Sequence, residues 1–176
     1  MGELTPYQKT MLATWHQHGI AEFVNRDPDA AIATMGPNPY ILALGFGRLY
    51  RGREGVYQFY KHDFLPNIPP DMEMHMVDRL VGDDRIIDEF VVRFTHTVEM
   101  PWKLPGVAPT GRRVEMAMFV LVAFEDDKIA YEHLMWNHAA VLAQVGVIAH
   151  PSAVAAGEGA SELLRLTATR RKGMFG

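Results

Sequence analysis

The chain contains no cysteine, which excludes disulfide bonds, thiolate nucleophiles and zinc sites built from sulfur ligands. It also has no run that approaches the roughly 18 consecutive apolar residues of a membrane-spanning helix. Its first residues, MGELTPYQKT, lack the apolar core of a signal peptide. We therefore expect a soluble, cytoplasmic protein without a membrane partner.

An excess of positive charge is also missing. The chain has 17 basic and 21 acidic residues, a formal net charge of −4, whereas nucleic-acid phosphates require a broad positive surface. No glycine-rich nucleotide fingerprint follows a predicted strand, and the eight histidines include no HExxH spacing. We therefore expect no nucleic-acid partner, no cofactor and no metal ion.

The length of 176 residues and the hydrophobic content of 48% are enough for one hydrophobic core. In the first half, helical spacing and N-terminal capping signals indicate three helices and one short strand. Thr5-Pro6 and Asp27-Pro28 each offer a capping side chain followed by a proline in the first turn. The predicted helices cover about 6–24, 28–35 and 52–65, and the strand covers 40–44.

The second half changes to a period of two. Met72, Met74 and Met76 alternate with polar residues, which is typical of a half-buried strand. Further strands are predicted over 85–98, 112–124 and 129–136, separated by a proline-rich loop over 99–111 and a hairpin at 125–128, with a closing helix over 139–145.

Helices first and an antiparallel meander afterwards favour an α+β domain, in which a curved antiparallel sheet wraps around three N-terminal helices and leaves a pocket at its open end. We expect this domain to occupy residues 1–150. Residues 151–176 are expected to form a C-terminal tail with a short helix over about 161–172.

Four ordered segments carry a family resemblance. They are YRGREGVYQFY, FVVRFTHTVEM, PGVAPTGRRVEM and FEDDKIAYEHLMWNHAAVLAQVGV. Together they resemble the SnoaL-like polyketide cyclase family of the nuclear transport factor 2-like superfamily. The resemblance implies a cone-shaped α+β fold with an apolar cavity, and a homodimer. Because the family includes cyclases, isomerases, hydrolases, dehydratases and binding proteins, the function has to be argued from the site.

The last predicted strand carries the leading site candidates. The family pattern places an aspartate, an acid or base in the cyclases, after a tryptophan, but this chain has Trp136-Asn137. An amide exchanges no proton at neutral pH, although it can donate a hydrogen bond to an oxyanion. If Asn137 faces the cavity, the strand period places Met135 and His133 there too. His133 is then the proton carrier, because an imidazole titrates at about pH 6.5; the alternative is a structural histidine.

Two further residues are candidates for the chemistry. His96 interrupts the apolar face of the strand over 85–98, so we expect it near the pocket mouth, with a rim residue paired to Glu99 as the alternative. Glu115 is the candidate carboxylate partner of a cavity histidine, and its alternative is simple surface exposure.

Large side chains supply candidate ligand-binding walls, with core packing as the alternative for each. They are Trp15, Tyr57, Tyr60, Trp102, Met135 and Trp136. The favoured hypothesis is a cofactor-independent cyclase, isomerase or hydrolase acting on a small, mostly apolar carbonyl compound. Two alternatives stay open: a non-catalytic small-molecule-binding protein, and a dimeric scaffold whose pocket is filled by its own side chains.

Overall fold

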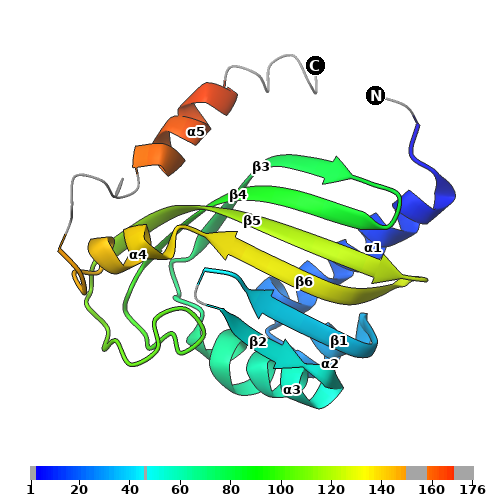
Figure 1. The fold of residues 1–176 in the computed structure, drawn as a ribbon, viewed down its shortest axis with the longest axis horizontal. Helices are drawn as coiled ribbons and strands as arrows, with labels where there is room; N and C mark the ends of the chain where they lie inside the picture. Colours follow the sequence, from blue (N-terminus) through cyan, green and yellow to red (C-terminus); the bar gives the residue numbers. More distant parts are fainter. Residues whose placement is uncertain (1–2, 46, 150–157, 169–176) are drawn as a thin grey trace.

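The computed structural model describes residues 3–45, 47–149 and 158–168. Six strands form one sheet in the order β2-β1-β6-β5-β4-β3, and this sheet curves around the N-terminal helices (Figure 1). The strands are β1 Met35–Ala43, β2 Arg48–Arg51, β3 Glu73–Val81, β4 Arg85–Thr95, β5 Arg113–Glu125 and β6 Lys128–Trp136. The helices are α1 Pro6–Gly19, η1 Ile20–Asn25, α2 Pro28–Ala33, α3 Gly52–Gln58, η2 Phe59–Phe64, η3 Leu65–Asn67, α4 His138–Gln144 and α5 Glu158–Ala168. The predicted α+β class with a curved sheet is confirmed.

The predicted N-terminal helix begins as expected and then changes its winding. The Gln8 amide donates to Thr5 Oγ1 at 3.2 Å, and the Thr5 amide donates to Gln8 Oε1 at 2.9 Å, which is a capping box. After Gly19 the helix continues as the π-helix η1, which has wider turns. It ends at Arg26, whose φ is 51°. This junction sets the positions of His18, at the end of α1, and Glu22, in η1. Both side chains belong to the candidate site described below.

The antiparallel meander β3-β4-β5-β6 agrees with the prediction, including a hairpin in which Glu125 pairs with Lys128. The first strand differs, because β1 begins at Met35 and lies parallel to β6. β2 was not predicted, because a strand of only four residues is too short to show a period. Since β1 and β2 extend the sheet beyond β6, the last strand of the meander becomes a central strand.

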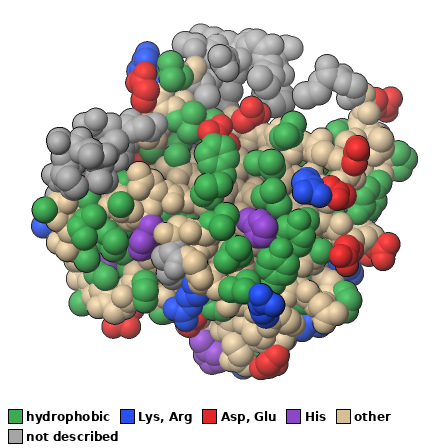
Figure 2. Space-filling view, in the orientation of Figure 1, with side chains coloured by type: hydrophobic (Ala, Val, Ile, Leu, Met, Phe, Trp, Pro, Cys, Tyr) green, Lys and Arg blue, Asp and Glu red, His purple; other side chains and the backbone are tan. Residues whose placement is uncertain are grey.

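The two faces of the sheet have different surroundings. On the inner face, Phe94 and Val114 are fully buried. On the outer face, Phe119 and Met135 pair across β5 and β6 and are 41% and 51% exposed. Figure 2 shows hydrophobic side chains gathered over the sheet on this face. The homodimer remains a prediction.

The C-terminal helix covers another part of the outer face. Val91 points outward between the inward-facing Phe90 and Val92, yet it is fully buried. Helix α5 contacts β3, β4 and β5, which explains this burial. The predicted tail helix is thus present at 158–168, and its expected end lies outside the described residues. None of the described helices is both long and apolar enough to cross a membrane.

Candidate active site

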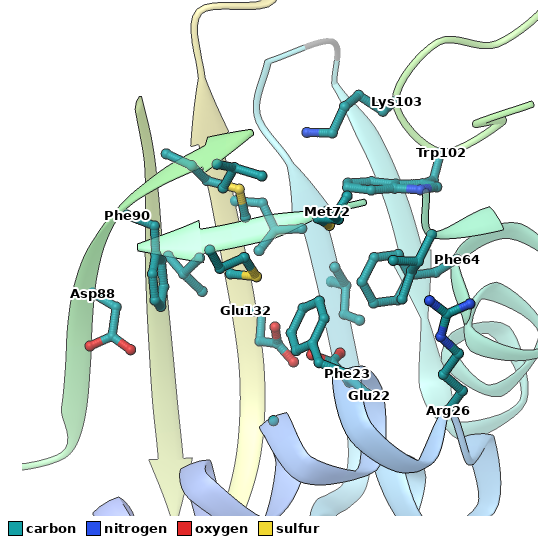
Figure 3. A pocket seen from close by; sticks show the side chains of 18 of the residues that line it. Glu22, Phe23, Arg26, Phe64, Met72, Asp88, Phe90, Trp102, Lys103 and Glu132 are labelled. Carbon is teal, nitrogen blue, oxygen red and sulfur yellow. The ribbon is translucent and has the colours of Figure 1, made fainter. Parts of the chain in front are cut away.

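The concave face of the sheet and the helices line a cavity of about 550 Å³, a size typical of small-molecule sites. Apolar and aromatic side chains from the sheet, η1, η2 and the loop after β4 form most of its wall (Figure 3). These include Phe23, Ile41, Phe59, Phe64, Met72, Met74, Phe90, Val92, Trp102, Met116, Met118 and Leu134. The cavity therefore suits a mostly apolar organic molecule.

A buried polar cluster lies against this apolar cavity. His18 Nε2 lies 3.1 Å from Glu22 Oε1, 3.3 Å from Glu132 Oε1 and 3.0 Å from the Tyr60 hydroxyl. His18 and Tyr60 are fully buried, and the two glutamates are 6% and 4% exposed. Only the glutamates line the cavity, where Figure 3 shows their carboxylates close together. His18 and Tyr60 lie behind the glutamates and contact them.

The sequence assembles this cluster from four elements. His18 at the end of α1 and Glu22 in η1 are four residues apart, so they lie on one helical face. Tyr60 comes from η2 and Glu132 from the central strand β6. Both contacts of the imidazole to the carboxylates use Oε1 atoms, so the Oε2 atoms are not engaged by His18. The carboxylates can meet a ligand while the imidazole holds them.

Hydrogen bonding fixes the protonation of His18. The Thr34 hydroxyl donates to the Ala31 carbonyl at 2.7 Å, so its oxygen accepts a hydrogen bond from His18 Nδ1 at 2.6 Å. Burial alone would lower the pKa of His18, but the charges of Glu22 and Glu132 outweigh it and raise the pKa to about 10. His18 is therefore an imidazolium at neutral pH, with both ring nitrogens protonated.

The carboxyl of Glu22 has the properties of a proton carrier. Burial raises its pKa above the usual range, the neighbouring Glu132 adds to this effect, and His18 opposes it. Burial, with a smaller contribution from Glu132, also raises the pKa of Tyr60 well above its usual value. Tyr60 thus stays a neutral phenol and donates to Glu132 Oε1 at 3.3 Å. A cavity-facing carboxyl with a raised pKa is a stronger base than an exposed one, and it can return the proton that it takes up.

A third carboxylate on the cavity wall has a structural role. Asp88 accepts two hydrogen bonds from Arg79, both at 2.6 Å, and one from Trp15 Nε1 at 2.7 Å. Both of its oxygens are therefore engaged, and it is fully buried. Asp88 holds the Trp15 indole in the cavity wall. We therefore interpret this buried acid as structural and not as a group that transfers protons.

The three residues predicted on the last strand do not face the cavity, so their expected orientation is wrong. His133 and Met135 point to the outer face, where His133 Nε2 contacts the Tyr40 hydroxyl at 3.1 Å. Asn137 is exposed and caps α4 by accepting from the Ala140 amide at 3.1 Å. The physical reason is the strand period: Trp136 points into the core, so its odd-numbered neighbours must point out.

His96 and Glu115 also lie elsewhere than the sequence predicted. His96 is fully buried but does not line the cavity, and its Nδ1 lies 3.2 Å from the Thr110 hydroxyl. Burial lowers its pKa, so the ring is neutral at pH 7. Glu115 lies on the outer face of β5 and accepts a hydrogen bond from Arg93 across the strands. Neither side chain contacts the cluster around His18.

The predicted aromatic walls are partly in place. Trp15 and Trp102 line the cavity, and Tyr60 belongs to the buried cluster instead. Tyr57 does not line the cavity; its ring lies 5.4 Å from the Lys61 ammonium. Among the described residues, no group of three or more histidine or acidic side chains has the arrangement of a metal site.

Signals in the sequence could have identified the residues that were missed. His18 and Glu22 have the spacing of one helical turn. Glu132 follows the same two-residue period as Leu134 and Trp136, and Asp88 precedes Phe90 in the same way. In both strands the sequence therefore shows a carboxylate, Glu132 or Asp88, on an otherwise apolar face.

Comparison with known proteins agrees with this architecture. The model of the SnoaL-like domain matches residues 16–132, so the chain belongs to the SnoaL-like family. A search among curated proteins found no match.

Solved structures with the same fold have low sequence identity to this chain. A protein provisionally named a SnoaL-like polyketide cyclase, from Jannaschia sp. CCS1, has a TM-score of 0.67 and 16% identity, covering 86% of this chain and 100% of its own. A phenazine biosynthesis-related protein from Pseudomonas aeruginosa has a TM-score of 0.64 and 14% identity, with coverages of 83% and 90%. A provisionally named hydroxylase from Streptomyces galilaeus has a TM-score of 0.60 and 16% identity, with coverages of 94% and 98%. At these identities the likeness shows the fold alone.

Proposed function

We propose that this protein is a cofactor-independent enzyme that moves protons on a small, mostly apolar carbonyl compound, in a reaction of the cyclase, isomerase or hydrolase type. One observation carries the proposal: two carboxylates, Glu22 and Glu132, face an apolar cavity and share one buried imidazolium. Two carboxylates beside one imidazolium give the cluster a net negative charge when both are ionised, and a purely structural core would avoid that charge because burying it costs free energy.

In the proposed mechanism Glu22 removes a proton from the carbon next to the ligand carbonyl and returns it at the end of the cycle. Burial favours the protonated form of this carboxyl, which makes it a sufficiently strong base for the first step and a competent acid for the last. His18 keeps its charge and holds both glutamates in place. Tyr60 fixes Glu132 by donating a hydrogen bond to it.

A non-catalytic small-molecule-binding protein is the second candidate. It is favoured by Asn137, which replaces the aspartate of the family pattern and lies outside the cavity. In that case the same cavity would bind a ligand without changing it, and the cluster around His18 would serve only to position the walls.

Hydrogen-deuterium exchange separates these two functions without knowledge of the natural substrate. The α-hydrogens of 1-tetralone, an apolar aromatic ketone, are followed by proton NMR in D₂O with and without the protein. We expect the protein to accelerate exchange, and Glu22→Gln to reduce the acceleration by about 100-fold or more, the usual range for loss of a general base.

Matched controls change groups outside the cavity. Glu115→Gln converts a carboxylate on the outer face, and His133→Ala removes the outer imidazole; both should leave exchange unchanged. Equal exchange in wild type and Glu22→Gln would contradict the proposal. Binding of the ketone to wild type without accelerated exchange would favour the binding protein instead.

A further inference from the structure

Lys103 is a buried basic side chain at a different part of the same cavity. It belongs to the loop after β4, is fully buried and lines the cavity next to Trp102. Its ammonium lies 3.7 Å from the ring centroid of Trp136 and 4.4 Å from that of Trp102. Figure 3 shows it at the opposite end of the view from Glu22.

The surroundings of Lys103 lack an anion. None of the ion pairs among the described residues includes it, and its hydrogen-bond acceptor there is the Met116 sulfur at 3.6 Å. A thioether is a weak acceptor, whereas an ammonium offers three donors. The indole Nε1 of Trp102 is also buried without a hydrogen-bond partner in the described part of the chain. This end of the cavity therefore supplies donors and requires an acceptor.

We propose that Lys103 binds an anionic oxygen of the ligand, and that the ligand is a flat aromatic compound carrying a carboxylate. The inference rests on the proposed use of this cavity by a small molecule, and it specifies the class of that molecule. A carboxylate supplies both the charge and the strong acceptor that Lys103 lacks. The indole faces of Trp102 and Trp136 already enclose the ammonium, and the apolar walls beyond them accept rings.

The charges of the cavity also set the orientation of such a ligand. A carboxylate is attracted by Lys103 and repelled by the acidic pair Glu22 and Glu132, since like charges in a poorly solvated site interact strongly. Arg26 also lines the cavity, but it is exposed to solvent, which screens its charge. The anionic end of the ligand therefore lies at the buried Lys103. Its uncharged end reaches toward the carboxylates that are proposed to move protons.

Proton uptake should accompany the binding of an acid. Burial holds the pKa of Lys103 well below its usual value, and a bound carboxylate would raise it again. His138 is the titratable neighbour; burial, followed by the charge of Lys103, lowers its pKa. Because a proton could be taken up at either group, a variant without Lys103 has to separate them.

The test uses 2-naphthoate and its uncharged analogue 2-naphthamide as probes. Isothermal titration calorimetry at pH 8, in buffers of different ionisation heats, measures both affinity and proton uptake. For wild type we expect naphthoate to bind at least about tenfold tighter than naphthamide, the effect of a charge-assisted contact of about 1.4 kcal/mol. Proton uptake should accompany the binding of naphthoate alone.

Variants assign these effects to Lys103. In Lys103→Met and in Lys103→Gln the preference for the acid and the proton uptake should both disappear. Lys61→Met is the matched control, because Lys61 also lies over an aromatic ring, that of Tyr57, but outside the cavity. This variant should keep the preference of wild type. Thermal melting of each variant establishes that it is folded.

Several results would overturn the inference. They are equal binding of acid and amide to wild type, failure of both to bind, and a preference that persists in the Lys103 variants. Glu22→Gln separates this inference from the proposed function. If that variant retains ketone exchange while the Lys103 variants lose the preference for the acid, the proposed mechanism fails and the carboxylate site stands.

Discussion

His18 and Lys103 are both fully buried bases beside one cavity, but their surroundings are opposite. His18 contacts two carboxylates, and its pKa rises to about 10. Lys103 contacts two indole rings and a thioether, and its pKa falls well below its usual value. The groups that contact a buried base, and not its burial alone, therefore decide whether it keeps its proton.

This difference divides the cavity into two functional ends. At one end the protein supplies both signs of charge itself, and the remaining acidity of Glu22 is available for proton transfer. At the other end it supplies hydrogen-bond donors, whose acceptor among the described residues is a thioether. In the proposed account a ligand completes the Lys103 end and is acted on at the Glu22 end.

The largest expected effect comes from removing the imidazolium that the two carboxylates share. His18→Gln should lower the free energy of unfolding by about 3 kcal/mol, because breaking a buried ion pair leaves uncompensated charge. Urea denaturation at pH 7 measures this change. His133→Gln, on the outer face, should cost less than about 1 kcal/mol as a surface substitution. A loss of similar size in both variants would contradict the account of the cluster.

The pH dependence of stability should differ between the two bases. His18 has a raised folded pKa, so its stabilising contribution is complete below about pH 6.5, the unfolded value, and is lost as the pH rises toward 10. The raised pKa of Glu22 acts in the same direction. Lys103 has a lowered folded pKa, so its unfavourable contribution fades as the pH rises toward the unfolded value.

Denaturation profiles of wild type and Lys103→Met between pH 7 and 9.5 test these opposite signs. Without the Lys103 contribution, the variant should lose stability more steeply than wild type as the pH rises. For one proton, the slopes of the unfolding free energy against pH can differ by at most about 1.4 kcal/mol per pH unit. Parallel profiles would show that Lys103 has an ordinary pKa.

Replacing Lys103 should stabilise the free protein. In Lys103→Met an apolar chain of similar length fills the space between the indoles, and the cost of burying an amine is removed. We expect a gain of about 1–2 kcal/mol at pH 7, in line with other replacements of buried charge by apolar residues. Lys61→Met should change stability by less than about 0.5 kcal/mol. Destabilisation by the Lys103 replacement would mean that the two indoles stabilise the ammonium fully.

The smallest predicted effect concerns the wall that Asp88 supports. Trp15→Phe removes the indole donor from Asp88 Oδ2, although Arg79 still engages both carboxylate oxygens. The cost should be about 1 kcal/mol, the value of one hydrogen bond together with some lost packing. Thermal melting measures it, with Tyr57→Phe as a control aromatic substitution outside the cavity. No loss would show that Arg79 alone holds Asp88.

Much of the fold could be predicted from the sequence because its signals are local. The Thr5-Pro6 and Asp27-Pro28 starts, the change of period after Met72 and the turn at Asp126 each act within a few residues. The parallel pairing of β1 with β6 has no such local signal, because it joins segments about 90 residues apart in the chain.

The candidate site was harder to predict, because it too depends on residues that are distant in the chain. Its cluster brings together residues 18, 22, 60 and 132, which only the folded chain places side by side. The orientation of β6 was assigned from Asn137, by analogy with the family aspartate. Since a shift of one residue moves every side chain to the other face, that assignment put His133 in the cavity and left Glu132 outside it.

The protonation state of His18 tests the central claim most directly. In protein labelled with ¹⁵N at histidine, NMR spectra at pH 8 should show both ring nitrogens of His18 protonated, and the signals should titrate near pH 10. A neutral His18 ring at pH 7 would contradict the account, because the two cavity carboxylates would then share no charged partner.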